Sequence, residues 1–385
     1  MDRNIRRIGI TEIDGFRFGA AEDAVGATGC TVVICPDGAV AGVDVRGGGP
    51  ATRETDLLAP DKKIDRIHAV VLSGGSAFGL DAASGVMAYL EEHEIGYDTF
   101  AGKVPIVCGA SLFDLIVGDA KARPDKAMGY AACTAAFDTG ASFQAGNHGA
   151  GTGATVGKYL GPARMMKSGI GAAAVQIGDI KIGAVAAVNA MGDVYDPETG
   201  ALIAGMLAPD GETVCGTSGA LLEGIECGRD VLGDGGVAGK FGVVSGGVAG
   251  KSGGASGGVA LDCVAGKPDG VSGGVAPDRV DCKPDGASGG VAENTTLVCV
   301  VTNAMMTKPQ AARMATLAHD GMARAVRPVH TSVDGDAVFA MASGKVNADA
   351  DVVACIAADL TAEAIKEAAL ASEPAYGLKS ARDFR

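Results

Sequence analysis

The sequence predicts a mixed α/β (α+β) fold built as a single domain over residues 1–385. Short runs rich in Val, Ile and Ala alternate with segments of helical periodicity, on both sides of a glycine-rich stretch. Hydrophobic residues make up 47% of the chain but aromatic residues only 4%, and Trp is absent. The core is therefore expected to be aliphatic and rich in alanine.

Five strands are expected before residue 190, because their residues are apolar or β-branched and turn residues bound them. Pro36-Asp37-Gly38 separates the first two strands and predicts a hairpin, and Gly178-Asp179 separates the last two. Between them, apolar residues at helical spacing predict a helix from Ser76 to about His93. The expected strands are Thr31–Cys35, Ala39–Val45, His68–Leu72, Ile170–Val175 and Ile180–Asn189.

The C-terminal region continues the alternation of strands and helices. Thr296–Thr302 is rich in β-branched residues and predicts a buried strand. The capping box Thr307-x-x-Gln310 then predicts a helix that ends near Val326. Asp336–Met341 predicts a further strand, and Leu360–Ala371 has the composition of a closing helix.

The glycine-rich stretch is residues 233–292, which hold 19 Gly in 60 positions and one aromatic residue, Phe241. The pentad Ser-Gly-Gly-Val-Ala occurs there four times, at spacings too irregular for a solenoid repeat. The segment has too little apolar surface to offset the entropy of ordering it. The sequence therefore predicts a flexible low-complexity loop inside the domain.

Charge and composition exclude several classes of function. Lys and Arg total 32 against 46 Asp and Glu, a formal net charge of −14, so we expect no nucleic-acid partner and no anionic membrane surface. The start of the chain has no secretory h-region, and no apolar run is long enough to cross a bilayer. The ten cysteines form no CxxC pair. We therefore expect a cytoplasmic protein with reduced thiols.

Familiar ligand-binding motifs fail on inspection. Gly149–Ala154 fits the loose pattern GxGxxA, but it does not follow a strand and lacks the acidic residue about 20 positions later. Ser73–Gly79 lies between a strand and a helix, where a tight turn capped by Ser76 is the simplest interpretation. His148 and His330 have no serine partner in the sequence and are interpreted as structural.

The junction Glu293-Asn294-Thr295-Thr296-Leu297 carries the chemical signal. A glycine-rich segment ends at a threonine that begins a buried strand. A Thr hydroxyl is a weak nucleophile until a base removes its proton. If the Asn294–Thr295 bond is cut, Thr295 gains an α-amine that titrates near 7.7–8.0 and lies within reach of its own hydroxyl. One residue would then supply both nucleophile and base, although such a loop can also simply join two strands.

Five segments together resemble one enzyme family, and they occur in that family's order. The resemblance is to the DmpA-like peptidases (L-aminopeptidase/D-amidase-esterases), and most closely to their nylon-oligomer endo-hydrolase branch. It covers most of the chain except 233–292. The segments are SGGSAFGLDAASGVM (73–87), GNHGAGTGATVGK (146–158), VNAMGDV (188–194), NTTLVCVVTNA (294–304) and HTSVDGDAVFA (330–340).

The resemblance implies a four-layer αββα sandwich of the N-terminal-nucleophile type, self-cleaved into a large chain 1–294 and a small chain 295–385. It implies Thr295 as nucleophile, surrounded by Lys158, Asn189, Asp334 and Asp336. Thr at the cut matches the nylon-oligomer branch, since the aminopeptidase branch uses Ser. That branch also has Tyr where this chain has Lys158, which weighs against β-peptide or D-peptide specificity. The family further implies a homo-oligomer, a tetramer.

The chemistry of these residues suits the implied roles. Asp334 and Asp336 are two positions apart at the entry to a strand, so both can point the same way, toward the amine of Thr295. When two carboxylates lie so close together, their mutual repulsion raises the pKa of one of them, so that it holds its proton more tightly than usual. A buried Lys158 could keep the Thr295 hydroxyl acidic or stabilise the ionised carboxylates, and Asn189 could donate to an oxyanion. Taken alone, Asp-Gly-Asp is also a common solvated turn.

The sequence thus predicts a self-processing amide hydrolase of the aminopeptidase or amidase type, acting on small peptides or amide oligomers without metal or organic cofactor. Two alternatives remain open. One is an acyltransferase like the ornithine acetyltransferases, which also cleave before a Thr. The other is a non-catalytic oligomeric binding scaffold that never cleaves.

Overall fold

The computed structural model describes residues 5–138, 140, 142–226 and 294–385. The predicted loop 233–292 lies outside the described residues. The proposed cleavage position lies just inside them, because Asn294 is the first described residue after the gap.

Ten strands join in one hydrogen-bonded order, β1-β11-β12-β15-β17-β3-β5-β8-β4, with β2 beside β3. β15 and β17 run parallel, whereas β12 and β3 flank this pair in antiparallel register. The strands are β1 Ile5–Arg7, β2 Arg17–Asp23, β3 Thr28–Val45, β4 Thr52–Arg53, β5 Arg66–Ser73, β8 Val107–Ser111, β11 Ile170–Ile177, β12 Ile180–Asn189, β15 Thr295–Ala304 and β17 Ala337–Val346.

Strand β3 converts this order into two facing sheets. Its pairing with β5 is interrupted between Ile34 and Ala39, where the intervening residues bulge out. Before the bulge β3 pairs with β2, and after it with β17. The predicted hairpin around Pro36-Asp37-Gly38 is therefore wrong. The turn residues are real, and Gly38 has a positive φ of 74°, but the two arms pair with other strands instead of each other.

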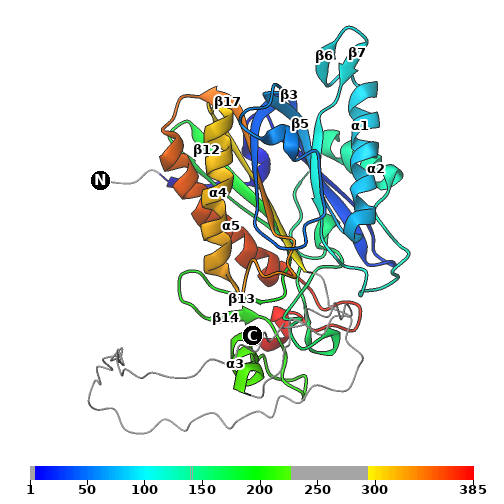
Figure 1. Ribbon diagram of the computed structural model, residues 1–385, viewed down its shortest axis with the longest axis vertical. Helices are drawn as coiled ribbons and strands as arrows, with labels where there is room; N and C mark the ends of the chain where they lie inside the picture. The colour runs from blue at the N-terminus through cyan, green and yellow to red at the C-terminus, as the bar shows by residue number, and fades with distance from the viewer. Residues whose placement is uncertain (1–4, 139, 141, 227–293) are drawn as a thin grey trace, which may run out of the picture.

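Two pairs of helices cover the outer faces of the sheets (Figure 1). α4 and α5 lie on the sheet that contains β12, β15 and β17, and α1 and α2 lie on the sheet that contains β5 and β8. The layers are therefore helix, sheet, sheet, helix, as the four-layer αββα expectation requires. The helices are α1 Ala82–Glu92, α2 Lys126–Phe137, α4 Lys308–Ala325 and α5 Ala350–Ala371.

Three apolar clusters bind the layers together. The central one is buried between the two sheets and joins Val33 and Leu72 of one sheet to Leu297 and Phe339 of the other. A second lies under α4 and α5, and a third under α1 and α2. Alanine is frequent in all three, so helices and sheets approach closely, in agreement with the expected aliphatic core.

The smaller elements lie around the ends of the sandwich. α3 Thr217–Glu226 and the three-stranded sheet of β13, β14 and β16 lie at the lower end of Figure 1. The remaining strands are β6 Tyr97–Thr99, β7 Gly102–Val104, β9 Thr155–Val156, β10 Met166–Lys167, β13 Asp193–Tyr195, β14 Leu202–Ala204 and β16 Val326–Arg327. The 3₁₀ segments are η1 Ile10–Glu12, η2 Asp56–Leu58, η3 Ser76–Asp81, η4 Gly149–Gly151, η5 Pro162–Arg164 and η6 Ala381–Phe384.

Most other predicted elements are present with shifted bounds. α4 begins at the predicted capping box, where the Gln310 side chain accepts the Thr307 N–H at 2.9 Å. The helix predicted from Ser76 begins as the 3₁₀ segment η3, since Ser76 itself has a positive φ of 53°. α5 begins at Ala350, ten residues before the prediction, because the Asp349 side chain caps it. α2 and β8 were not predicted.

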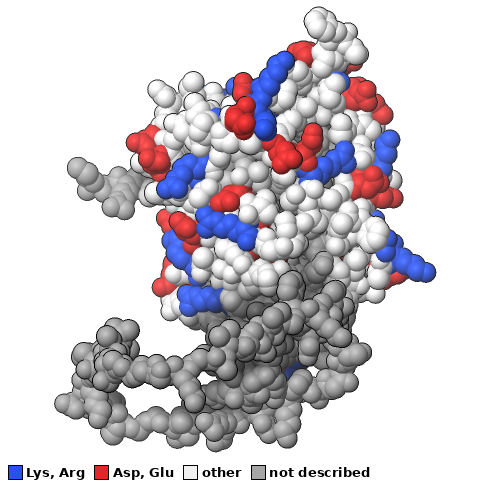
Figure 2. Space-filling model, viewed as in Figure 1, with Lys and Arg blue, Asp and Glu red and all other residues white. Residues whose placement is uncertain are grey.

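The surface mixes charges of both signs. On the face shown in Figure 2, Lys and Arg lie among Asp and Glu, and neither sign of charge dominates the coloured part of that face. None of the helices in the described part of the chain is long and apolar enough to cross a membrane.

Candidate active site

Thr295 is the first residue of β15, a strand in the middle of its sheet. It lies opposite Asn189, the last residue of β12, in the antiparallel register of the two strands. Both residues are buried. The sheet therefore fixes the predicted nucleophile at a strand end, beside a polar side chain.

The peptide carbonyl that precedes Thr295 is held by two donors. The Gly335 N–H donates to the Asn294 oxygen at 2.6 Å, and the Thr295 hydroxyl lies 2.5 Å from the same oxygen. Asn294 also pairs with the segment at Asp334 through a parallel bridge. A backbone N–H aimed at a carbonyl oxygen stabilises the negative charge that forms when that carbonyl is attacked.

Lys158 is buried and points at four oxygen atoms. Its Nζ lies 2.9 Å from the Asn189 carbonyl oxygen, 2.8 Å from Asn189 Oδ1 and 2.8 Å from the Thr155 carbonyl oxygen, with the Thr155 hydroxyl at 3.1 Å. Burial lowers the pKa of Lys158 well below its usual value, while the nearby carboxylates of Asp334 and Asp114 oppose that shift. The lysine is thus an amine whose charge depends closely on its neighbours.

Asn189 uses its side chain on both sides. Its Oδ1 accepts from Lys158 and from the Thr155 N–H at 3.0 Å, and its Nδ2 donates to the Phe113 carbonyl at 2.8 Å. An amide nitrogen has two protons, so the contact with Phe113 accounts for one of them. The fixed orientation of Asn189 is the property that an oxyanion donor needs.

Asp334 and Asp336 lie just before β17 and are both about 1% exposed. Asp336 Oδ1 accepts the Thr296 N–H at 2.7 Å, next to the predicted nucleophile. Asp334 accepts from the Thr331 N–H and hydroxyl, at 2.9 and 2.5 Å. Burial, together with the negative charge of Asp336, raises the pKa of Asp334 to about 6. The predicted tightening of a proton on this pair therefore falls on Asp334.

The backbone of Met191 links the lysine to the carboxylate pair. Its carbonyl accepts the Lys158 N–H at 3.0 Å, and its N–H lies 3.4 Å from Asp334 Oδ1. The structure thus gathers all the sequence-predicted site residues at one end of the sandwich: Lys158, Asn189, Asn294, Thr295, Asp334 and Asp336.

Sequence reasoning missed two members of this group. One is Gly335, whose contribution is a backbone N–H that no residue type reveals. The other is His330, interpreted as structural, whose Nδ1 lies 2.8 Å from Asp336 Oδ2. The resemblance segment HTSVDGDAVFA contained both residues, so the signal was present, but the loop conformation that joins them was not predictable from spacing.

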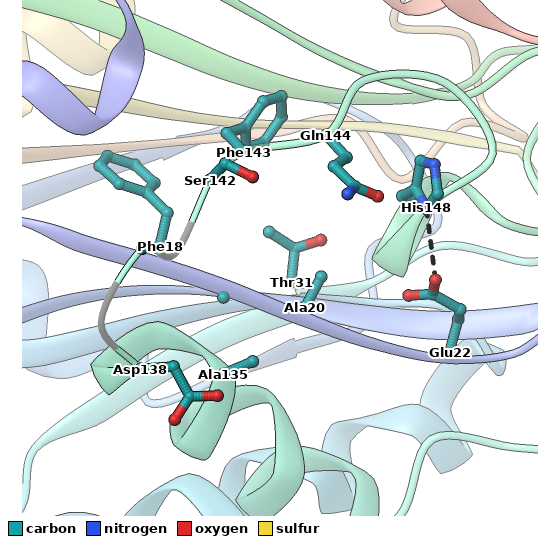
Figure 3. Close-up of a pocket in the computed structure, with 12 residues that line it drawn as sticks. Phe18, Ala20, Glu22, Thr31, Ala135, Asp138, Ser142, Phe143, Gln144 and His148 are labelled. Atoms are coloured by element: carbon teal, nitrogen blue, oxygen red, sulfur yellow. Dashed lines mark hydrogen bonds and ion pairs between the residues drawn. The ribbon is translucent and has the colours of Figure 1, made fainter.

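A cavity of about 340 Å³ lies elsewhere, between β2 and the loop after α2 (Figure 3). Phe18 and Phe143 line one part of it, and His148 contacts Glu22 across the other at 3.3 Å. None of the predicted site residues lines this cavity. In the described segments no group of three or more His, Cys, Asp or Glu side chains is placed to hold a metal ion.

Comparison with protein-family models decides the family. The model of peptidase family S58 matches residues 9–382. The chain belongs to peptidase family S58. As an S58 peptidase it is a hydrolase of amide or peptide bonds, and the acyltransferase and scaffold alternatives are not favoured.

Two relatives illustrate the range of names among similar proteins. A Mycobacterium leprae protein designated an uncharacterized aminopeptidase is 35% identical over 394 residues, covering 96% of this chain and 92% of the relative. The 6-aminohexanoate-oligomer endohydrolase of a Kocuria species is 26% identical over 371 residues, covering 93% of this chain and 85% of the relative. Identity is thus higher to the mycobacterial protein than to the endohydrolase.

Solved structures match the fold. The L-aminopeptidase D-Ala-esterase/amidase of Ochrobactrum anthropi, described as a variant of the Ntn hydrolase fold, superposes with a TM-score of 0.60 at 17% identity, covering 97% of this chain and 90% of that one. A Burkholderia β-aminopeptidase superposes with a TM-score of 0.56 at 18% identity, covering 95% of this chain and 87% of that one. The expected N-terminal-nucleophile sandwich is confirmed.

Proposed function

We propose that this S58 hydrolase is self-processing, and that Thr295 serves first as the nucleophile of its own cleavage and then of substrate hydrolysis. The observation that carries the proposal is the carbonyl of Asn294, which accepts the Gly335 N–H at 2.6 Å while the Thr295 hydroxyl lies 2.5 Å away. A peptide bond poised in this way has its oxyanion donor in place before any reaction begins.

Self-cleavage follows from that contact. The Thr295 oxygen attacks the Asn294 carbonyl carbon, and its proton passes to the Thr295 nitrogen as the C–N bond breaks. An ester between Asn294 and the Thr295 hydroxyl remains, and water hydrolyses it to a free carboxylate. The products are chains 1–294 and 295–385, and Thr295 now carries an α-amine.

Substrate hydrolysis then uses the same groups. The α-amine takes the hydroxyl proton as Thr295 attacks the substrate carbonyl, and gives it to the leaving amine. Water then hydrolyses the acyl ester left on Thr295, which releases the carboxylic acid and restores the hydroxyl. Asp336 accepts a hydrogen bond from the N–H of Thr296, the residue after Thr295, and orients the Thr295 amine with Asp334 beside it. Lys158 holds Asn189 in place at 2.8 Å, and the remaining amide proton of Asn189 is directed at the substrate oxyanion.

We propose small peptides or amide oligomers as the substrate class. The support is the pair of relatives named as an aminopeptidase and as a 6-aminohexanoate-oligomer endohydrolase. Amino-acid anilides with a free amine, compared with amide oligomers whose amine is blocked, separate these two activities. An aminopeptidase requires the free amine, and an endohydrolase does not.

The decisive experiment is the mass of the purified protein under denaturing conditions. We expect fragments of 294 and 91 residues, with N-terminal sequencing of the smaller one giving Thr-Thr-Leu-Val. The variant Thr295→Ala should remain a single chain and be inactive, with its fold preserved. A small fragment that begins at another residue would refute Thr295 as the nucleophile.

Assembly and compartment belong to the same proposal. We propose a homo-oligomer, a tetramer, which sedimentation of the purified protein tests directly. A cytoplasmic location is supported by the cysteines, because Cys30, Cys35, Cys108, Cys133 and Cys299 are buried free thiols. Cell fractionation with an antibody against the small chain measures the location.

A further inference from the structure

His330 contacts the active-site carboxylate Asp336 twice. Its Nδ1 lies 2.8 Å from Asp336 Oδ2, and its backbone N–H donates to the same oxygen at 3.0 Å. The other oxygen, Oδ1, accepts the Thr296 N–H at 2.7 Å. The Asp336 carboxylate is therefore clamped between His330 on one side and the residue after Thr295 on the other.

The backbone of His330 is strained in a way that serves this contact. Its φ is +58°, in the left-handed region that residues other than Gly adopt rarely. Such strain persists only where surrounding contacts hold it, and it gathers at functional sites. Here the strained conformation brings both donors of His330 to one oxygen of Asp336.

The groups around His330 fix its proton. A carboxylate only accepts hydrogen bonds, so Nδ1 of His330 carries the proton in this contact. The ring of His319, from α4, packs edge-on at a centroid distance of 4.7 Å. Burial lowers the pKa of His319 to about 4, so that ring is neutral, and its Nε2 lies 3.0 Å from the Asp44 carbonyl. Behind it, Asp44 and Arg46 pair with each other at 3.1 Å.

We propose that His330 is a positioning residue of the hydrolase, acting through Asp336 to hold that carboxylate against the α-amine of Thr295. The inference rests on the proposed function, because the amine exists only after self-cleavage. The arrangement is analogous to a catalytic triad, in which the base that activates the nucleophile is itself oriented by a third group. In this chain the base is the Thr295 amine, its orienting group is Asp336, and His330 fixes the orienting group.

Three substitutions of His330 test the proposal. His330→Ala removes the side-chain donor and should lower kcat about ten- to a hundred-fold with KM nearly unchanged. His330→Asn places an amide N–H where Nδ1 was and tolerates the left-handed backbone, so it should recover most of the lost kcat. His330→Gln places its amide farther out and should not. The acidic limb of the pH–rate profile should move to higher pH in His330→Ala and His330→Gln, which lack the side-chain donor to Asp336, and stay in place in His330→Asn.

His93→Ala is the matched control, since His93 is an exposed histidine at the end of α1 whose partners are the Tyr89 carbonyl and the rings of Tyr89 and Phe137, none of them in the candidate active site. It should leave kcat unchanged. Wild-type kcat in His330→Ala, or equal losses in His330→Asn and His330→Gln, would overturn the proposal. If His330→Ala does not fold, the comparison of Asn with Gln still decides it. A wild-type protein that neither cleaves itself nor hydrolyses amides would instead refute the proposed function, whatever the His330 variants do.

Discussion

At the scale of single residues, the structure buries lysines whose partners are mostly backbone oxygens. Lys158 and Lys167 are both buried, and burial lowers the pKa of Lys167 to about 7. Lys167 donates to the carbonyls of Gly151, Ala154 and Ser168, whereas Lys158 reaches Asn189 beside the proposed nucleophile Thr295. Comparing the two lysines therefore separates the effect of a buried lysine on stability from its effect on activity.

Lys158→Met should abolish activity and also lower the free energy of unfolding by about 1–3 kcal/mol, because it leaves buried oxygens without their donor. The stability loss is measured by urea unfolding, and activity on an amide substrate. Lys167→Met is the control, and should lose comparable stability but retain kcat. Equal activity losses in both variants would show that Lys158 acts only by holding the fold.

Gly335→Ala tests the proposed oxyanion donor. A Cβ at this position would lie 2.6 Å from Thr295 Oγ1 and 2.8 Å from the Gly49 oxygen, so the N–H and the hydroxyl cannot both stay in place. We expect self-cleavage to slow about 10²–10³-fold, followed as the appearance of the small chain on a denaturing gel. Gly49→Ala, whose added Cβ has no neighbour closer than 3.9 Å, should cleave at the normal rate.

The raised pKa of Asp334 makes a prediction about stability and pH. The folded chain binds this proton more tightly than the unfolded chain does, so the resulting stabilisation is present at low pH and lost as pH rises from about 4 to about 6. The difference between 3.8 and about 6 corresponds to about 3 kcal/mol. Asp334→Asn, made in a Thr295→Ala background, has no such proton to lose. Its free energy of unfolding relative to the Thr295→Ala parent, measured by urea unfolding, should therefore rise by up to about 3 kcal/mol between pH 4 and pH 7. A difference that is independent of pH would contradict the shift.

At the scale of elements, close helix packing depends on glycine and alanine. α4 meets α5 at Gly321, where an added Cβ would lie 1.9 Å from the Ala358 carbonyl oxygen. Gly321→Ala should therefore lower the free energy of unfolding by about 1–3 kcal/mol, although alanine has the better helix propensity. Gly219→Ala in α3, where an added Cβ has nothing within 4 Å, should be neutral or slightly stabilising. Thermal unfolding of both variants decides between packing and propensity.

The sequence predicted elements better than their pairing. Ile180–Asn189 and the capping box at Thr307 were predicted with nearly correct bounds, because periodicity and caps are local signals. The bend in β3 was not, since Pro36-Asp37-Gly38 is equally suited to a hairpin and to a bulge. The site shows the same division. Thr295 and the two aspartates follow from residue type and resemblance, whereas the roles of Gly335 and His330 depend on loop geometry.

At the scale of the whole molecule, the proposed cleavage leaves two interleaved chains. The small chain 295–385 would contribute β15, β17, α4 and α5, and the large chain would contribute the flanking strands β12 and β3. We expect the two fragments to remain together through size-exclusion chromatography and to separate only in denaturant. Fragments that elute separately without denaturant would contradict this arrangement of the cleaved protein.

The position of β15 has a further consequence for how activity arises. β15 and β17 lie between β12 and β3, which would both belong to the large chain after the proposed cleavage. Removing the small chain would therefore separate β12 from β3 and divide the strand order in two. The Gly335 N–H reaches the Asn294 carbonyl only when β15 and β17 are paired in the sheet, because these two strands set the relative position of the two residues. A misfolded or half-made chain would therefore not release the α-amine of Thr295 and would remain an inactive precursor. The proposed cut would then make activity conditional on folding, because only a chain that has already reached its native topology would become a working enzyme.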